Sequence, residues 1–190
     1  DHGPQEIAVF GVGSMGYGMA QSLLRAGHQV HGFDLLPEAM ARFQAEGGAP
    51  GALADIAPNL DAVVAVVLNA EQTASVLFGG QGVVPRLKDG AVVVYCATVP
   101  PQFAMDAEAR CAAVNVHYLD APISGGSVKA AAGQLSVMAA GRPDAFAAAS
   151  AVLEATSETV FKMGDQAGPG SVMKSVNQLL AGVHIATMAE

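Results

Sequence analysis

The segment EIAVFGVGSMG, residues 6–16, joins a short apolar run to the pattern G-x-G-x-x-G formed by Gly11, Gly13 and Gly16. The pattern is informative here because the run before it predicts a strand and the residues after it predict a helix. In that setting Gly11 permits a tight turn, Gly13 lets the backbone approach a pyrophosphate, and Gly16 allows the helix to pack closely on the strand. The free N–H groups at the helix start favour a phosphate. The segment therefore predicts a dinucleotide-binding turn.

The rest of the chain alternates short apolar runs with helical patterns. Strands are predicted at residues 7–10, 29–33, 62–68, 91–95, 117–121, 135–139 and 159–162. Helices are predicted at residues 14–26, 37–44, 70–78, 101–113, 127–132 and 143–154. Uninterrupted apolar strands such as VVAVVL and AVVVY suit a sheet that is covered on both faces. This order predicts an α/β fold with a doubly wound, mainly parallel Rossmann sheet.

Asp34 follows the second predicted strand, at the distance where an acidic residue hydrogen-bonds the ribose 2′-hydroxyl of NAD. Positions 35 and 36 hold no arginine that could pair with the 2′-phosphate of NADP. That phosphate would meet a negative charge and no counter-ion. The sequence therefore predicts NAD rather than NADP.

Other strand ends are expected to line the same crevice, because ligands of such sheets bind beyond the carboxyl ends of the strands. These ends offer Leu68 and Asn69, then Thr98, and then the turn Ser124-Gly125-Gly126 within DAPISGG. Asn69 equally suits the N-cap of the helix that follows it, and Thr98 has the same ambiguity. The residues alone leave both readings open.

The composition excludes several classes of protein. Of the 190 residues 52% are hydrophobic and only 14% charged, which argues against a disordered chain. The net charge of −8 and the scattered Lys and Arg residues argue against nucleic-acid binding. No run is long enough to span a membrane, and the first residues, DHGPQE, show no signal peptide. Cys96 and Cys111 fit no metal or disulfide spacing, so we expect two buried, reduced thiols in a cytoplasmic protein without a metal.

The final segment, residues 171–190, reads as a helix that is apolar around most of its circumference. We expect it to begin a long helix whose packing partners belong to a second domain or another subunit. The sequence is therefore predicted to divide into a Rossmann domain at residues 1–164 and the start of an interdomain helix at residues 165–190. The apolar helix also predicts a homo-oligomer, either a dimer or a tetramer. Within this helix Lys174, Asn177 and Gln178 project from one face. A surface role and a catalytic role for the lysine are both open from the residue types alone.

Three segments, GVGSMGYGMA, DAPISGG and GPGSVMKSVNQ, together resemble the β-hydroxyacid dehydrogenase family, which includes the 3-hydroxyisobutyrate dehydrogenases. The longer stretches DAPISGGSVKAAAGQLSVMAAG and NQLLAGVHIA are most similar to the L-threonate dehydrogenase group. The resemblance covers nearly the whole chain. It implies an oxidoreductase that transfers a hydride between NAD and a small hydroxyacid, with an all-helical second domain beyond this chain.

The resemblance also implies roles for individual residues. Lys174 matches the catalytic lysine, which acts as general acid and base. The residues that match the family's substrate-binding positions, which hold the substrate carboxylate and surround it, are Ser124, Gly125, Gly126, Thr98, Asn177 and Gln178. The cofactor-binding positions match Gly11, Val12, Gly13, Ser14, Met15, Gly16, Asp34, Leu68, Asn69 and Thr98. Ala97 departs from the family pattern, because a serine usually precedes the position of Thr98.

Three other readings compete with this one. An imine reductase shares the fold and the glycine turn, but tends to replace the lysine. A 6-phosphogluconate dehydrogenase needs basic residues for a substrate phosphate, and only Lys129, expected to be a solvated helix residue, lies near the Ser-Gly-Gly turn. A non-catalytic dinucleotide-binding module is the third. Structural roles are expected for the histidines, with His28 and His31 reaching solvent.

Overall fold

The computed structural model describes residues 3–13, 15–66 and 69–168. The strands are β1 (Glu6–Phe10), β2 (Gln29–Phe33), β3 (Ala62–Ala65), β4 (Val92–Tyr95), β5 (His117–Asp120), β6 (Ile123–Ser124), β7 (Leu135–Ala140) and β8 (Ser157–Gly164). The helices are α1 (Met15–Arg25), α2 (Pro37–Ala45), α3 (Leu53–Ile56), α4 (Ala70–Phe78), α5 (Pro101–Ala112), α6 (Gly126–Ala132) and α7 (Pro143–Thr156), with 3₁₀ turns η1 (Ala57–Asn59) and η2 (Val84–Arg86).

The sheet has the order β2-β1-β3-β4-β5-β7-β6, and β8 pairs with β7. The first five strands are parallel, while β7 runs antiparallel to β5 and β6. The predicted mainly parallel Rossmann sheet is thus confirmed. Its strand order reverses between β1 and β3, since β2 lies on one side of β1 and β3 on the other. That reversal is where open sheets of this kind form their ligand crevice.

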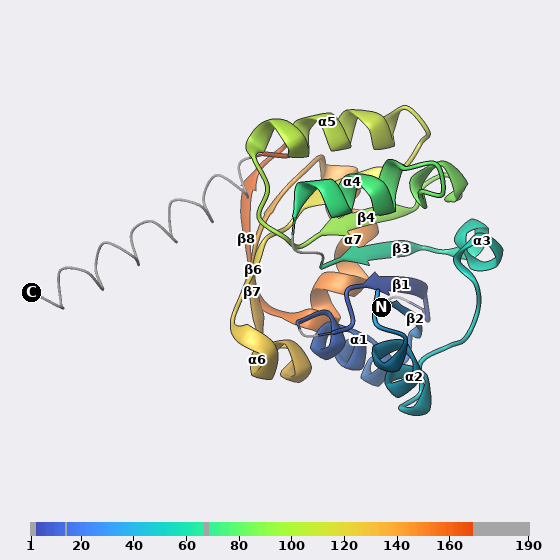
Figure 1. The fold of residues 1–190 in the computed structure, drawn as a ribbon. Coiled ribbons are helices and arrows are strands. Elements are labelled where there is room, and N and C mark those ends of the chain that lie inside the picture. The colour runs from blue at the N-terminus through green and yellow to red at the C-terminus, as the bar shows by residue number, and fades with distance from the viewer. Residues whose placement is uncertain (1–2, 14, 67–68, 169–190) are drawn as a thin grey trace, which may run out of the picture.

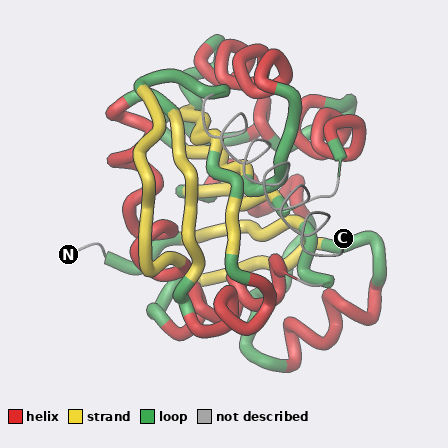
Figure 2. The backbone as a smooth tube through the Cα atoms, turned by 90° about the vertical axis from the view of Figure 1, so that its left-hand side faces the viewer, coloured by secondary structure: helices red, strands yellow, loops and turns green. Residues whose placement is uncertain are grey.

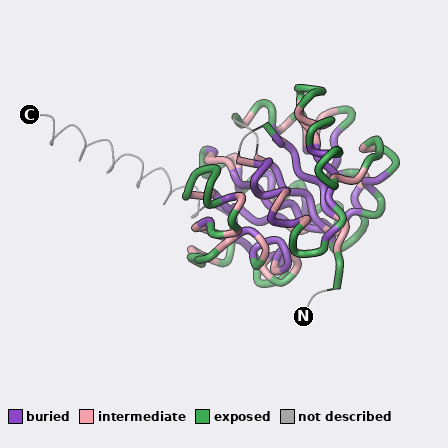
Figure 3. Tube along the Cα trace, turned by 90° about the horizontal axis from the view of Figure 1, so that it is seen from below, coloured by how far each residue is buried: buried purple, intermediate pink, exposed green. Residues whose placement is uncertain are grey.

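Helices cover both faces of the sheet, and each face has its own apolar cluster. Ile7, Val9 and Val64 point toward α1, α2 and α7, whereas Ala8 and Val63 point toward α4 and α5. In Figure 1, α4 and α5 lie above the sheet and α1 and α2 below it. Figure 2 shows the strands side by side between helices, and Figure 3 shows buried stretches of chain in the interior with exposed stretches around them. Strands β3 and β4 are buried at every residue. Burial on both faces explains why these strands read as continuous apolar runs.

All strands and helices predicted between residues 7 and 162 are present, with ends that differ by a few residues. The sequence patterns did not predict four short elements, which are α3, η1, η2 and the two-residue strand β6. The strand predicted at 62–68 is shorter, because β3 ends at Ala65. The residues at 165–168 form bends. The helix predicted at 171–190 lies outside the described residues, so the division at 164/165 stays a prediction.

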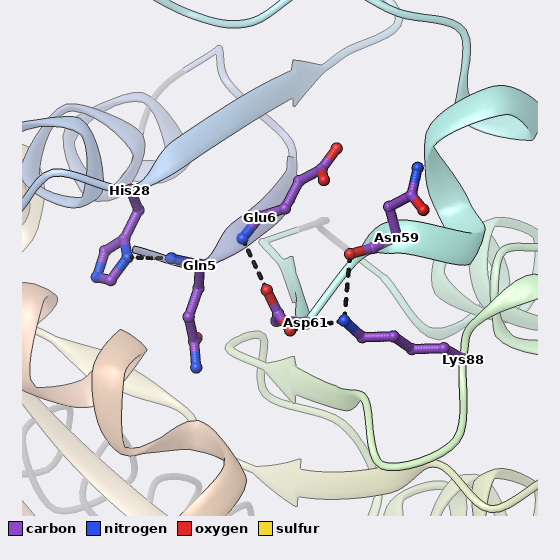
Figure 4. A network of polar contacts seen from close by, with 6 residues as sticks. All are labelled: Gln5, Glu6, His28, Asn59, Asp61 and Lys88. Carbon is purple, nitrogen blue, oxygen red and sulfur yellow. Dashed lines mark hydrogen bonds and ion pairs between the residues drawn. The ribbon is translucent and has the colours of Figure 1, made fainter. Parts of the chain in front are cut away.

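The amino ends of β1, β2 and β3 are joined by a polar network (Figure 4). The Gln5 N–H donates to His28 Nδ1 at 3.0 Å, and the Glu6 N–H donates to Asp61 Oδ2 at 2.9 Å. Lys88 Nζ donates to Asp61 Oδ1 at 2.8 Å. His31 is 2% exposed, with its Nε2 3.0 Å from Glu6 Oε1. The expected structural roles of His28 and His31 are confirmed, but their expected exposure is wrong, because both rings are buried in contacts between strands.

Both cysteines are buried and free, as expected. Burial raises the pKa of Cys96 and of Cys111 to about 12. The charge of Asp120 also raises the pKa of Cys96, while at Cys111 Arg110 lowers the pKa and Glu108 raises it. Among the described residues, no helix combines the length and the apolar character needed to cross a membrane.

Candidate active-site crevice at the carboxyl edge of the sheet

The glycine turn follows β1 directly, at the reversal of strand order. The Gly11 N–H donates to the Phe33 carbonyl at 2.8 Å, which ties the turn to the end of β2. Gly11 has φ +99°, and a Cβ there would lie 2.5 Å from the Val66 carbonyl oxygen. A Cβ on Gly16 would overlap the Gly11 carbonyl. The steric roles expected of Gly11 and Gly16 are therefore present, and only glycine fits either position.

The rest of the turn divides between core and surface. Val12 is buried in the cluster around α1, and Met15 begins that helix with a half-buried side chain. Gly13 is exposed. Its backbone is therefore accessible from outside, as an approaching phosphate requires.

Asp34 lies across the turn from Gly13. A Cβ on Gly13 would be 3.2 Å from Asp34 Oδ2. The other carboxylate oxygen, Oδ1, accepts a hydrogen bond from the Leu36 N–H at 2.9 Å, which fixes the side chain. The following residues, Leu35 and Leu36, are 88% and 53% exposed and carry no charge. The crevice thus combines an open backbone turn with a fixed, half-buried carboxylate.

The segment after β3 ends in a capped helix. Asn69 Oδ1 accepts from the Gln72 N–H at 2.8 Å, so Asn69 is the N-cap of α4. The Thr73 hydroxyl donates to the Asn69 carbonyl at 2.8 Å and also contacts the buried Tyr95 hydroxyl at the end of β4. The capping alternative left open by the sequence is therefore confirmed. A cofactor contact by the remaining amide N–H₂ of Asn69 stays a prediction.

The segment after β4 carries Thr98 to the same edge. The Cys96 N–H donates to the Ala65 carbonyl at 2.9 Å, which continues the ladder one residue beyond the strand. Ala97 and Thr98 are half-buried, and Val99 is buried under α5. Thr98 is thus at the carboxyl end of a central strand, three residues before α5 begins.

The Ser-Gly-Gly turn does not follow β5 directly, because β6 intervenes. Ser124 lies on β6 and pairs with Ser136 of β7. Gly125 and Gly126 have φ +136° and +76°, which residues with a Cβ rarely adopt, and both are exposed. They open α6, on which Lys129 is exposed as expected. The antiparallel pair of β6 and β7, which α6 separates in the chain, depends on pairing between distant residues, and local patterns do not reveal it.

One cluster of buried polar contacts near the same edge was not predicted from the sequence patterns. Asp120 ends β5 and is fully buried, and its Oδ2 accepts from the Gly168 N–H at 3.0 Å. Glu108 Oε2 on α5 accepts from the neighbouring Ala167 N–H, also at 3.0 Å. The sequence signal for this cluster is an acidic residue at the end of the predicted strand HYLD, because a buried carboxylate needs hydrogen-bond partners.

Several predicted site residues lie outside the described residues: Ser14, Leu68, Lys174, Asn177 and Gln178. The structure brings the glycine turn, Asp34, Asn69 and Thr98 to one edge of the sheet. A cavity of about 350 Å³ lies elsewhere, beside His117 at the amino end of β5, with Asn115 and Arg142 among its lining residues. None of the predicted site residues lines that cavity.

A parallel sheet whose order reverses at a glycine turn, with an acid held across that turn, defines a Rossmann dinucleotide-binding domain. The chain belongs to the family described as the NAD binding domain of 6-phosphogluconate dehydrogenase, whose model matches residues 6–164.

Proteins similar over nearly the whole chain include several that are hydroxyacid dehydrogenases by name. The L-threonate dehydrogenase of Cupriavidus necator is 46% identical over 98% of this chain and 63% of that protein. The 3-hydroxyisobutyrate dehydrogenase of Pseudomonas aeruginosa is 36% identical over 97% of this chain and 62% of that protein. The crystal structure of 3-hydroxyisobutyrate dehydrogenase from Salmonella typhimurium has a TM-score of 0.90 at 43% identity, covering 96% of this chain and 64% of that one. The chain thus spans less than two thirds of the length of these relatives.

Proposed function

We propose that this chain is the cofactor-binding part of an NAD-dependent dehydrogenase that oxidises a small hydroxyacid of the 3-hydroxyisobutyrate or L-threonate type. The observation that carries the proposal is the fixed position of Asp34 across the open Gly13 backbone, at the reversal of strand order. The named relatives support the substrate class, since they act on hydroxyacids by name.

The described residues fit NAD. Gly11, Val12, Gly13, Met15 and Gly16, together with Ser14, form the turn for the pyrophosphate, while Asp34 accepts hydrogen bonds from the adenosine ribose. Asn69 and Thr98 line the path toward the reacting end, and Leu68, which is outside the described residues, is assigned to the same path from the sequence alone. NAD is preferred over NADP because Asp34 repels a 2′-phosphate and its uncharged neighbours Leu35 and Leu36 offer no counter-ion.

The substrate is held by its carboxylate. Ser124, Gly125 and Gly126 offer a hydroxyl and backbone N–H groups for it, and both glycines are exposed and have positive φ values. Thr98, Asn177 and Gln178 complete the surroundings of the substrate. No phosphate-binding cluster is required, and Lys129 on α6 is an exposed residue.

Lys174 moves the proton. It accepts the proton of the substrate hydroxyl during oxidation and returns it during reduction, and general acid–base catalysis of this kind contributes about 100- to 10,000-fold to a rate. When bound, NAD supplies the acceptor for the hydride. We further propose that the complete enzyme is a cytoplasmic homo-oligomer in which residues 165–190 begin an interdomain helix that leads to a second, helical domain.

The test uses the full-length protein. We expect oxidation of L-threonate or 3-hydroxyisobutyrate with NAD, followed by absorbance of NADH, and a loss of about 100- to 10,000-fold in kcat for Lys174→Ala. NAD affinity, measured by calorimetry, remains unchanged in that variant. Wild-type turnover in Lys174→Ala would remove the lysine from the mechanism. NAD binding without oxidation of any hydroxyacid would leave a non-catalytic binding module, and activity on imines instead would point to an imine reductase.

A further inference from the structure

Two carboxylates hold the main chain where it leaves the described part of the structure. The Gly168 N–H donates to Asp120 Oδ2 and the Ala167 N–H donates to Glu108 Oε2, both at 3.0 Å. The two donors are consecutive backbone groups, while the acceptors come from β5 and α5. Asp120 is fully buried and Ala167 is 2% exposed, so water does not compete freely for these bonds.

The anchored residues lie against the start of α5. Gly168 has φ +115°, and a Cβ there would be 3.5 Å from Met105 Cγ and 3.6 Å from the Pro101 carbonyl oxygen. In Figure 1 the orange-red end of the coloured ribbon accordingly passes beside α5. Pro101 follows Thr98 by three residues, and Asp120 pairs with Tyr95 at the carboxyl edge. The anchor is therefore on the same edge of the sheet as the candidate crevice.

A buried carboxylate is costly to retain unless it accepts hydrogen bonds, so Asp120 needs a reason to be there. Burial, and secondarily the charge of Asp120, raises the pKa of Cys96 to about 12 and that of Tyr118 well above its usual value. Those groups therefore stay uncharged at neutral pH beside the carboxylate. A core packed for stability alone has no need of a charge at this position.

We propose that Asp120 is a positioning residue for the dehydrogenase reaction: together with Glu108 it fixes the main chain at residues 167–168, from which the chain continues to the catalytic lysine. This inference rests on the proposed function. Lys174 follows Gly168 by six residues. Six residues span at most about 20 Å, so the anchor limits where the lysine is placed. A misplacement of about 1 Å at a reacting group lowers a rate by about 100-fold.

The experiment compares four variants in the full-length enzyme. In Asp120→Ala, kcat falls at least about tenfold, while KM for NAD changes less than about twofold. Hydrogen exchange of the Gly168 amide rises at least about tenfold, because its acceptor is lost. Asp120→Asn retains an acceptor oxygen and recovers part of both losses. Glu108→Ala frees the Ala167 amide and has a smaller effect on kcat.

Asp106→Ala is the matched control. Asp106 lies on α5, like Glu108, is exposed, and accepts a hydrogen bond from Gln102 Nε2 of the same helix at 2.9 Å. It is expected to leave kcat and both exchange rates unchanged. If Asp120→Ala does not fold, Glu108→Ala decides the question, because Glu108 is only half-buried.

The outcomes separate the anchor from the proposed function. Fast exchange at Gly168 with wild-type kcat would overturn the positioning role while leaving the dehydrogenase intact. Unchanged exchange in Asp120→Ala would overturn the anchor itself. A wild-type protein that oxidises no hydroxyacid would overturn the proposed function and the positioning role with it, and exchange at Gly168 would still report whether the anchor exists.

Discussion

The Ser22 hydroxyl on α1 donates a hydrogen bond of 2.7 Å to the Ala130 carbonyl on α6. Helix α1 begins at the glycine turn proposed for the cofactor, and α6 begins at the Ser-Gly-Gly turn proposed for the substrate. One helix–helix contact therefore links the two turns. Gly18 lies at the centre of this contact, since a Cβ there would be 2.7 Å from the Ala131 nitrogen.

Gly18→Ala tests this contact. The added methyl group forces α6 away from α1, and we expect a loss of about 1–3 kcal/mol in the free energy of unfolding. Gly80→Ala is the control, because no atom lies within 4 Å of the added Cβ. Urea denaturation measures both. An equal free energy of unfolding in the two variants would show that α6 can move away from α1 without loss of stability.

Removal of the Asp34 carboxylate weakens NAD binding. Asp34→Ser removes a charged acceptor of the ribose hydroxyls, and we expect a Kd for NAD that is about 10- to 100-fold higher. The Kd for NADP falls or stays constant, because a repulsive charge is lost. Asp55→Ala changes the net charge by the same amount on α3, before β3, and leaves both Kd values unchanged. A constant ratio of the two Kd values in Asp34→Ser would contradict the assigned preference for NAD.

The two possible roles of Asn69 separate in two substitutions. Asn69→Ala removes the N-cap of α4 and costs about 1 kcal/mol in stability. Asn69→Ser keeps a capping oxygen but lacks the amide N–H₂, so stability is retained. If the amide contacts the cofactor, NAD affinity falls in both variants. Calorimetry with NAD and thermal unfolding measure the two effects, and unchanged NAD affinity in Asn69→Ser leaves Asn69 as a cap alone.

The sequence predicts those parts of the site that depend on local geometry. The roles of Gly11 and Gly16 can be predicted because a tight turn and a close helix contact each require the absence of a Cβ. The role of Asp34 can be predicted from its distance along the sequence to that turn. The anchor at Gly168 is different. Asp120 and Gly168 are 48 residues apart. No local pattern records that a strand-end carboxylate meets a backbone N–H from the far end of the domain.

The same limit explains the strand missed at Ile123–Ser124. Its two residues have no period of their own, and only pairing with Val137 and Ser136 of β7 makes them a strand. The error in the exposure of His28 and His31 has a related cause. The sequence shows only that both stand near the start of a strand, whereas the fold brings His28 against Gln5, just before β1, and His31 against Glu6 of β1.

Alkaline pH is expected to destabilise the domain. Burial raises the pKa of Cys96 and Cys111 from 9.0 to about 12, and that of Tyr95 from 10.0 to about 12. Above pH 9 the unfolded chain therefore releases protons that the folded chain retains. Because the unfolded state then binds fewer protons, the free energy of unfolding falls as pH rises toward 12. This contribution to stability is fully present below pH 9.

Cys111→Ala isolates one of these groups. Between pH 8 and pH 10.5 the wild-type protein loses about 2 kcal/mol more stability than this variant, whose position 111 no longer titrates. Val116→Ala serves as the control, since it removes buried apolar volume close to Cys111 without a titrating group and keeps the wild-type slope. Urea denaturation at pH 8, 9 and 10.5 gives the change in the free energy of unfolding with pH for the wild-type protein and the two variants. A Cys111→Ala slope equal to that of wild type would mean that the thiol at 111 ionises as readily in the folded protein as in the unfolded chain.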